Sequence, residues 1–244
     1  SLVGFPVVID AYAGRVMETE YEANTAIAER EFDGQVTMVV GGTKATDVID
    51  VMSHLGEKVD DFLLGSDPAQ LFLRAQGHPL GYDVGDAALF DEQYEANEDT
   101  IVRMLEERGD QITLPVDMAY EGEDGHHEEI AVEDVPEDED IAFLDVGSET
   151  VMEYSPVIRE SEAVFLKGAL GVFEVEAFSV GTVGVLEAIA DTDCFSVVGG
   201  GDTSRAIGMY GLDEADFDHV SIAGGAYIRA LTGADLVGVE ALQQ

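Results

Sequence analysis

The sequence predicts an α/β protein built on a doubly wound, mostly parallel sheet with helices on both faces. Short apolar runs alternate with helical segments along most of the chain. Four of these runs end in glycine turns, and the carboxyl ends of parallel strands are where such sheets bind ligands. With 46% hydrophobic residues among 244, the chain has ample material for a core.

The first elements follow a loop or extended segment over residues 1–10, where Pro6 restricts Phe5 to extended geometry. Residues 13–31 contain no proline and predict a long amphipathic helix. Five side chains of this segment fall near one face: Val16, Met17, Tyr21, Thr25 and Ala28. Residues 36–40 form a continuous apolar run before Gly41-Gly42, which predicts a strand buried on both faces.

The same alternation continues as far as residue 116. Helices are predicted over residues 46–54, 69–75 and 91–108, and strands over residues 62–64 and 111–116. Pro68 suits the first turn of the second of these helices, because its missing N–H group has no intrahelical partner there.

Residues 121–140 interrupt the pattern with acids, glycine and proline. His126 and His127 lie in this segment, but adjacent side chains face different ways and rarely bind one metal ion together. The composition therefore favours a solvated excursion over a metal site.

The last part of the chain returns to alternating strands and helices. Strands are predicted over residues 142–146, 163–166, 195–198 and 219–222. The expected helices cover residues 148–160, 176–190, 203–210, and a last segment that follows Gly224-Gly225 and reaches Leu231 before Gly233. The whole series is typical of a Rossmann-like arrangement.

Glycine turns at four strand ends predict a binding crevice: Gly41-Gly42, Gly168 with Gly171, Gly199 to Gly201, and Gly224-Gly225. Glycine lets backbone N–H groups approach a phosphate, and the N-terminus of a following helix favours negative charge. The spacing matches neither the dinucleotide fingerprint nor the P-loop. Asp202 opens the helix after Gly201, where a carboxylate can cap the helix, hold a magnesium ion, or do both.

The strongly acidic charge of this chain disfavours two classes of partner. It has 52 acidic and 11 basic residues, so nucleic acid and anionic membranes are not expected to bind it. The acids are interspersed with apolar runs, which favours a folded, halophile-like acidic surface over a disordered acidic tail. Loss of structure in low salt is expected, because a Debye length of about 3 Å in molar salt screens the repulsion.

The remaining compositional signals favour a cytoplasmic protein. The single cysteine, Cys194, adjoins a predicted buried strand and is interpreted as a small core residue. No apolar run approaches the length of a membrane span, and the first residues lack the basic flank of a signal peptide. The chain begins at Ser1, which suggests that a segment upstream is not present.

Several motifs together resemble the phosphoglycerate kinase family, in its C-terminal nucleotide-binding part. Gly41-Gly42-Thr43-Lys44 is similar to its Gly-Gly-Ala-Lys loop, and the order and spacing of the later motifs also resemble it. These are Leu114-Pro115-Val116-Asp117, Leu144-Asp145-Val146-Gly147, Gly171-Val172-Phe173-Glu174, Gly199-Gly200-Gly201-Asp202-Thr203 and Gly224-Gly225-Ala226. Gly147-Ser148-Glu149-Thr150 resembles archaeal members, in agreement with the haloarchaeal-like composition.

The resemblance implies a glycolytic enzyme that transfers a phosphoryl group between 1,3-bisphosphoglycerate and Mg²⁺-ADP, giving 3-phosphoglycerate and ATP. It implies that Asp202 holds the magnesium ion, that Glu174 binds the ribose, and that Gly224 and Gly225 bind the transferring group. Other nucleotide contacts are implied at Gly42, Thr43, Lys44, Gly171, Val172, Gly200, Gly201 and Thr203. Residues 1–32 would be the leading segment with an interdomain helix, and residues 33–244 the nucleotide-binding domain.

The chain departs from the family pattern where a cation is expected. The family usually has a second lysine four residues after Lys44, and this chain has Val48. Lys167 stands where the family commonly has asparagine, so we hypothesise that it restores a catalytic positive charge from the opposite side of the crevice. Gly65-Ser66-Asp67-Pro68 replaces a third glycine loop, and Ile222-Ala223 replaces Thr-Gly.

The resemblance also implies an N-terminal substrate domain that is absent from this chain and that binds the triose. The isolated chain, expected to be a monomer, should therefore bind nucleotide weakly and turn over little or nothing. Two alternatives remain at this point: a non-catalytic nucleotide-binding module, and a different phosphotransferase or sugar-nucleotide enzyme on the same sheet.

Overall fold

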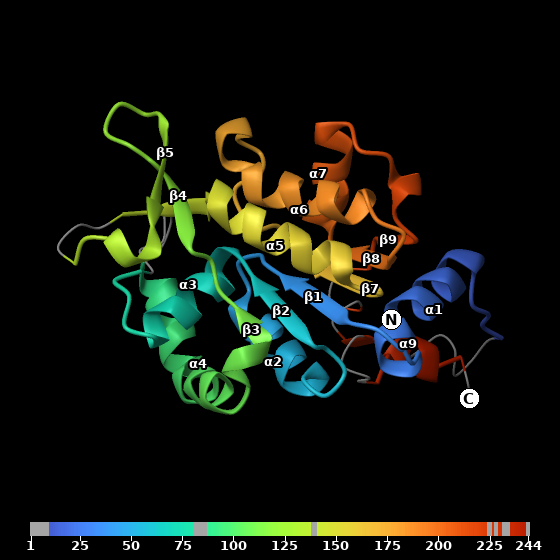
Figure 1. Cartoon of the computed structure of the whole chain (residues 1–244). Helices are drawn as coiled ribbons and strands as arrows, with labels where there is room; N and C mark the ends of the chain where they lie inside the picture. Colours follow the sequence, from blue (N-terminus) through green and yellow to red (C-terminus); the bar gives the residue numbers. More distant parts are fainter. Residues whose placement is uncertain are drawn as a thin grey trace.

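The computed structural model describes residues 10–80, 87–137, 141–223, 226, 229, 230 and 235–242. Figure 1 shows a central sheet between layers of helices, with a smaller sheet at one end. The large sheet has six strands, and every strand pair in it is parallel. The predicted fold class is therefore confirmed.

The large sheet has the strand order β3-β2-β1-β7-β8-β9. Its strands are β1 (Val36–Val40), β2 (Asp61–Leu64), β3 (Ile112–Thr113), β7 (Ala163–Lys167), β8 (Phe195–Gly199) and β9 (His219–Ser221). The chain runs outward from β1 on one side and then outward from β7 on the other. The strand order thus reverses between β1 and β7, which is the point where open parallel sheets form a ligand crevice.

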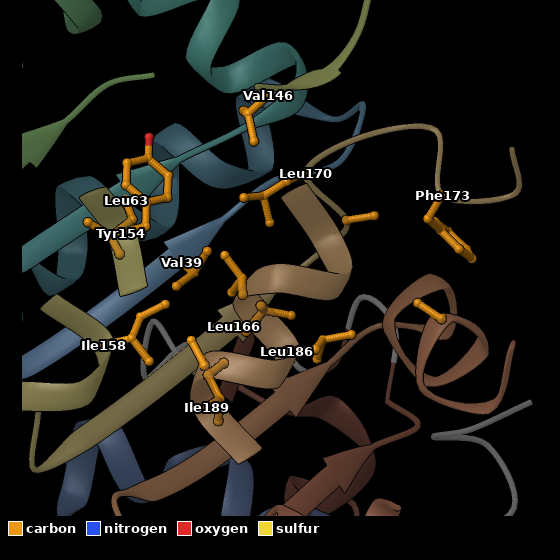
Figure 2. Packing of buried hydrophobic residues seen from close by; sticks show 14 of the residues in the cluster. Val39, Leu63, Val146, Tyr154, Ile158, Leu166, Leu170, Phe173, Leu186 and Ile189 are labelled. Carbon is orange, nitrogen blue, oxygen red and sulfur yellow. The ribbon is translucent and has the colours of Figure 1, made fainter. Parts of the chain in front are cut away.

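Each face of the large sheet is covered by a set of helices. One set is α2 (Ala45–Leu55), α3 (Ser66–Ala75) and α4 (Ala87–Arg108), and the other is α5 (Ser148–Glu160), α6 (Val180–Ala190) and α7 (Gly201–Tyr210). Successive β1 side chains alternate between the layers, so Met38 packs with the first set and Val39 with the second. Figure 2 shows Val39 with Leu166, Leu186 and Ile189 in the second layer.

A three-stranded antiparallel sheet adjoins the second layer, and the sequence did not predict it. It has the order β5-β4-β6, with β4 (Asp117–Glu121), β5 (His127–Ala131) and β6 (Phe143–Val146). The interpretation of residues 121–140 as a solvated excursion did not anticipate a strand, and in the structure His127–Ala131 pair with β4 although no position of that strand is fully buried. The strand predicted over residues 142–146 exists, but it belongs to this small sheet.

Other boundaries differ in smaller ways. The strand expected over residues 111–116 is confined to Ile112–Thr113, after the 3-10 turn η1 (Gly109–Gln111). The helix expected from residue 176 begins as the 3-10 turn η3 (Glu176–Phe178), and α6 follows it. Two more 3-10 turns are η2 (Val132–Asp134) and η4 (Glu214–Asp216).

The chain ends are only partly described. The predicted first helix is confirmed as α1 (Arg15–Glu29), which packs against β9, but Val16 is exposed rather than on the packed face. The predicted segment over residues 1–10 lies almost wholly outside the described residues, and so do Gly224 and Gly225. Ala226, Arg229 and Ala230 are helical, and α9 (Val237–Glu240) follows. No described helix is both long and apolar enough to cross a membrane.

Candidate functional site

The turns that follow β1, β7 and β8 converge at one edge of the large sheet. Val40 is in register with Lys167, and Lys167 with Gly199, so the three strands end at the same level. The backbone N–H of Gly41 donates to the Lys167 carbonyl over 2.8 Å, and that of Gly168 donates to the Gly199 carbonyl over 3.3 Å. We call this region the glycine edge: Gly41, Gly42, Gly168, Gly199, Gly200 and Gly201.

Close approach of backbones explains why side chains are missing from the glycine edge. A Cβ atom on Gly168 would lie 2.5 Å from the Gly41 carbonyl oxygen, and φ of Gly168 is +80°. Gly200, which precedes α7, has a φ of +113°. Both values fall where side chains are strained. The edge is consequently a backbone surface located at the reversal of strand order.

Two lysines provide positive charge at the glycine edge. The Lys167 ammonium is half-buried, and it donates a long hydrogen bond to the Gly41 carbonyl over 3.4 Å. Burial lowers the pKa of Lys167, the charge of Lys44 lowers it further, and Asp47 and Asp202 oppose the shift. Among the described residues, neither Lys167 nor the exposed Lys44 forms an ion pair with a carboxylate. These cations are available to a bound anion.

The first turn of α7 carries the predicted metal ligand. The Asp202 side chain is 69% exposed, and one of its oxygens lies 3.7 Å from an Arg205 nitrogen. Among the residues that the structure covers, no cluster of three or more His, Cys, Asp or Glu side chains could hold a metal ion. One exposed carboxylate nevertheless fits Mg²⁺, which is commonly held by one or two carboxylates together with substrate phosphates. The buried Thr203 donates its hydroxyl to the Gly199 carbonyl over 3.1 Å.

The loop of residues 171–174 meets the same helix turn through an ion pair. Glu174 accepts a hydrogen bond from Arg205 over 3.1 Å, and the Arg205 guanidinium lies 5.5 Å from the centre of the Phe173 ring. Arg205 thus lies between the carboxylates of Glu174 and Asp202. The sequence reasoning did not single out Arg205, although its i,i+3 spacing from Asp202 is a helical pairing signal.

The described site residues therefore fall into two adjoining groups. Gly42, which begins the turn with Thr43 and Lys44, lies beside Lys167 and Gly168, and Gly168 lies beside Gly200. Glu174, at the end of the loop that contains Gly171 and Val172, adjoins Asp202 through Arg205. Val48 is fully buried in the core, so that turn of α2 presents no cation to the crevice. The predicted roles of Gly224 and Gly225 fall outside the described residues.

A second polar network, also missed from the sequence, joins α1 to β9. The Glu20 carboxylate accepts hydrogen bonds from the Ser221 hydroxyl over 2.7 Å and from the Ile222 N–H over 3.1 Å, and it lies 3.1 Å from His219 Nε2. Burial alone would raise the pKa of Glu20, but the hydrogen bonds and His219 outweigh it, so the pKa is lowered. The network fixes α1 against the end of β9.

Cavities occur away from the glycine edge. One of about 430 Å³ lies between α1 and the last part of the chain, with Met17 and Val239 in its wall. Another of about 520 Å³ is lined by Arg30, Phe195 and Asp218.

Comparison with known proteins identifies close relatives. The family model described as phosphoglycerate kinase matches residues 1–234. A phosphoglycerate kinase of Haloarcula marismortui is 76% identical over the whole chain, and one of Halorubrum lacusprofundi is 70% identical over 243 residues; the chain covers 60% of each. This chain therefore spans about 60% of the length of these curated relatives.

Solved structures are similar in fold as well. The phosphoglycerate kinase from Pyrococcus horikoshii OT3 superposes with a TM-score of 0.86 at 28% identity, over 99% of this chain and 60% of that one. The phosphoglycerate kinase from Coxiella burnetii gives a TM-score of 0.82 at 31% identity, over 95% of this chain and 58% of that one.

Proposed function

The chain belongs to the phosphoglycerate kinase family, and on that premise we propose that it is the C-terminal, nucleotide-binding part of such a kinase. In this proposal residues 1–32 are the leading segment and interdomain helix, and residues 33–244 are the nucleotide-binding domain. The triose site belongs to an N-terminal domain outside this chain. We further propose that the protein is haloarchaeal-like, that it is located in the cytoplasm, and that it is a monomer.

The proposed reaction is phosphoryl transfer between 1,3-bisphosphoglycerate and ADP in glycolysis. The bond between phosphorus and the acyl oxygen breaks, a terminal oxygen of ADP bonds to that phosphorus, and the carboxylate of 3-phosphoglycerate leaves. Such transfer depends on positioning and charge stabilisation more than on covalent participation by the protein.

One observation carries this proposal. Two lysines without a carboxylate partner among the described residues lie where glycine turns meet, in a chain of net charge -41. A phosphate-bearing ligand matches both their charge and the exposed backbone of these turns.

Each site residue has a role in the proposal. Gly42, Thr43 and Lys44 contact the phosphates, as do Gly200, Gly201 and Thr203, while Gly171, Val172 and Glu174 contact the nucleoside. Asp202 holds Mg²⁺, which neutralises phosphate charge when it is bound with the nucleotide. Gly224 and Gly225 bind the transferring group. Lys167 supplies the cation opposite Lys44, a role favoured by its half-buried ammonium.

Calorimetric titration of the chain with Mg²⁺-ADP in molar potassium chloride tests the nucleotide site. We expect weak binding that weakens further without magnesium, and Asp202→Asn should reduce that difference. Absence of binding to the folded chain would contradict the proposal.

Coupled turnover tests the proposed division between two domains. The chain alone should convert little or no substrate, and adding the N-terminal part of a close relative should produce activity. Near-normal turnover by the chain alone would refute the assignment of the triose site to another domain.

A non-catalytic nucleotide-binding module is the second candidate. It is favoured by the buried Val48 and by Ile222, which is 69% exposed just before Gly224-Gly225. This candidate predicts nucleotide binding without phosphoryl transfer even when the other domain is supplied.

A further inference from the structure

Asp145 is a buried carboxylate that adjoins the loop of residues 171–174 and has no role in the proposed chemistry. It belongs to β6 and is 2% exposed. Its Oδ1 accepts a hydrogen bond from the Val146 N–H, and its Oδ2 accepts one from the Gly181 N–H in the first turn of α6, both over 2.9 Å. The carboxylate therefore joins the small sheet to the start of α6.

The loop closes on this carboxylate with no space for a side chain. A Cβ atom on Gly171 would lie 2.2 Å from Asp145 Oδ1, and one on Gly181 would lie 2.4 Å from the same oxygen. Loop, helix turn and carboxylate thus form one tight contact, which only glycine permits at these two positions.

Two hydrogen bonds hold the loop on either side of Gly171. The Val172 N–H donates to the carbonyl of Leu144, the neighbour of Asp145, over 2.7 Å. The Leu170 N–H donates to the hydroxyl of Thr182, the neighbour of Gly181, over 3.0 Å. Thr182 is fully buried. Figure 2 shows Leu170 in the buried layer together with Val146 and Val39.

We infer that Asp145 and Thr182 are positioning residues for the loop of residues 171–174, which contacts the nucleoside in the proposed function. By fixing Leu170 and Val172 between β6 and α6, they determine where Glu174 stands relative to Arg205 and Asp202 on α7. Neither is exposed to the crevice, so they act on the nucleotide only through the loop. The inference rests on the proposed nucleotide site and deepens it.

Asp117 provides a matched control for Asp145. It lies on β4 of the same small sheet and is 4% exposed. Its oxygens accept hydrogen bonds from the N–H groups of Glu149 and Thr150 at the start of α5, over 3.0 and 2.8 Å. Asp117 thus caps α5 much as Asp145 caps α6, but among the described residues it forms no hydrogen bond with residues 170–174.

Asp145→Asn and Asp117→Asn should separate positioning from folding. The NH₂ group of asparagine cannot accept a hydrogen bond, whereas both oxygens of a carboxyl group can, whether or not it is protonated, so each variant turns an NH₂ group toward a backbone N–H. We expect both melting temperatures to fall by several degrees in molar potassium chloride. Only Asp145→Asn should weaken Mg²⁺-ADP binding, by about tenfold, with Asp117→Asn within about twofold of wild type. Equal affinity changes in the two variants would overturn the inference.

Thr182→Val and Thr182→Ser test the same loop without altering a charge. Valine keeps the shape of threonine and removes the hydroxyl that binds the Leu170 N–H, whereas serine keeps the hydroxyl. We expect Thr182→Val to weaken Mg²⁺-ADP binding about fivefold and Thr182→Ser to bind within about twofold of wild type. Equal affinities of the valine and serine variants would contradict a positioning role.

Hydrogen exchange distinguishes failure of this inference from failure of the proposed function. Without nucleotide, amides of residues 170–174 should exchange faster in Asp145→Asn and Thr182→Val than in Asp117→Asn. If the wild-type chain binds no Mg²⁺-ADP but this exchange pattern appears, the proposed site fails and the loop anchorage stands. If nucleotide binds and the exchange pattern is absent, the inference fails alone.

Discussion

The glycine edge and the small antiparallel sheet treat charge in opposite ways. At the glycine edge, Lys167 has a single long hydrogen bond to a carbonyl, and neither it nor Lys44 pairs with a described carboxylate. In the small sheet, Asp117 and Asp145 are more deeply buried, yet each accepts two backbone N–H groups. Both of those bonded to Asp117, and one of those bonded to Asp145, lie at the start of a helix.

This difference separates a charged group that can bind a ligand from carboxyl groups that hold the structure together. A buried carboxyl group is tolerated when hydrogen bonds satisfy it, and it then fixes the elements that supply them. A half-buried charge without such partners gains most from a ligand of opposite sign. Buried acidic residues of the small sheet thus hold helix starts in place, while Lys44 and Lys167 supply positive charge to the crevice.

Removing salt is the largest perturbation of this arrangement. The net charge is -41, and the Debye length grows from about 3 Å in molar salt to about 30 Å at 0.01 M. Repulsion between carboxylates should then unfold the chain in dilute buffer. Thermal melts followed by circular dichroism, in dilute buffer and in molar potassium chloride, measure the effect, and an unchanged melting temperature would refute it.

The next largest effect is the pH dependence caused by Asp145. Burial raises its pKa from the ordinary 3.8 to about 8, although the Gly181 and Val146 N–H groups oppose the shift. Between these values Asp145 is protonated in the folded chain and ionised in the unfolded chain. The contribution of Asp145 to the free energy of unfolding therefore falls as pH rises from about 4 to 8. The fall can approach about 1.4 kcal/mol per pH unit.

Denaturant unfolding of wild type and Asp145→Asn, at several pH values between 5 and 9 in molar potassium chloride, isolates this contribution. The stability advantage of wild type over the variant should shrink with rising pH and level off above pH 8. Asp117→Asn, measured in the same series, controls for the other acids. A difference that stays constant with pH would show that Asp145 does not titrate in this range.

Parallel strands were predictable because their signals are local. Residues 36–40, apart from Thr37, and residues 163–166 are apolar, as a strand buried on both faces requires, and the structure buries them. The small sheet lacked such a signal, since His127–Ala131 is a polar edge strand in which no position is fully buried. The run at 142–146 resembled the others, and nothing local says which sheet it joins.

The candidate site was predictable where backbone geometry demands glycine. Gly42, Gly168 and Gly200 have positive φ, which favours glycine, so the glycines in the sequence indicate those turns. Arg205 with Glu174, and Glu20 with His219, were not predicted, because these contacts join residues 31 and 199 positions apart. Because acidic residues are so common in this chain, the sequence does not indicate which glutamate contacts a distant residue.

Lys167→Ala tests the glycine edge directly. The variant removes the half-buried ammonium, and we expect Mg²⁺-ADP affinity to fall about tenfold, since a charge-assisted contact to phosphate is lost. Lys58→Ala is the matched control, because Lys58 follows the far end of α2 and its loss changes net charge equally. Unchanged nucleotide affinity, together with unchanged turnover in a full-length enzyme, would count against the role of Lys167.

Ser66→Gly is the smallest of these changes and concerns the turn after β2, beside the glycine edge. Ser66 has a φ of +52°, a strained value for a residue with a side chain, and its N–H donates to the Leu170 carbonyl over 3.1 Å. Glycine removes the strain and keeps the N–H, although the greater freedom of the unfolded chain offsets part of the gain. We expect stability to rise by up to about 1 kcal/mol, seen as a higher denaturant midpoint at unchanged slope. Ser66→Ala keeps a Cβ atom and should give no gain. A loss of stability in the glycine variant would mean that the Ser66 side chain, and not the backbone alone, holds this turn against Leu170.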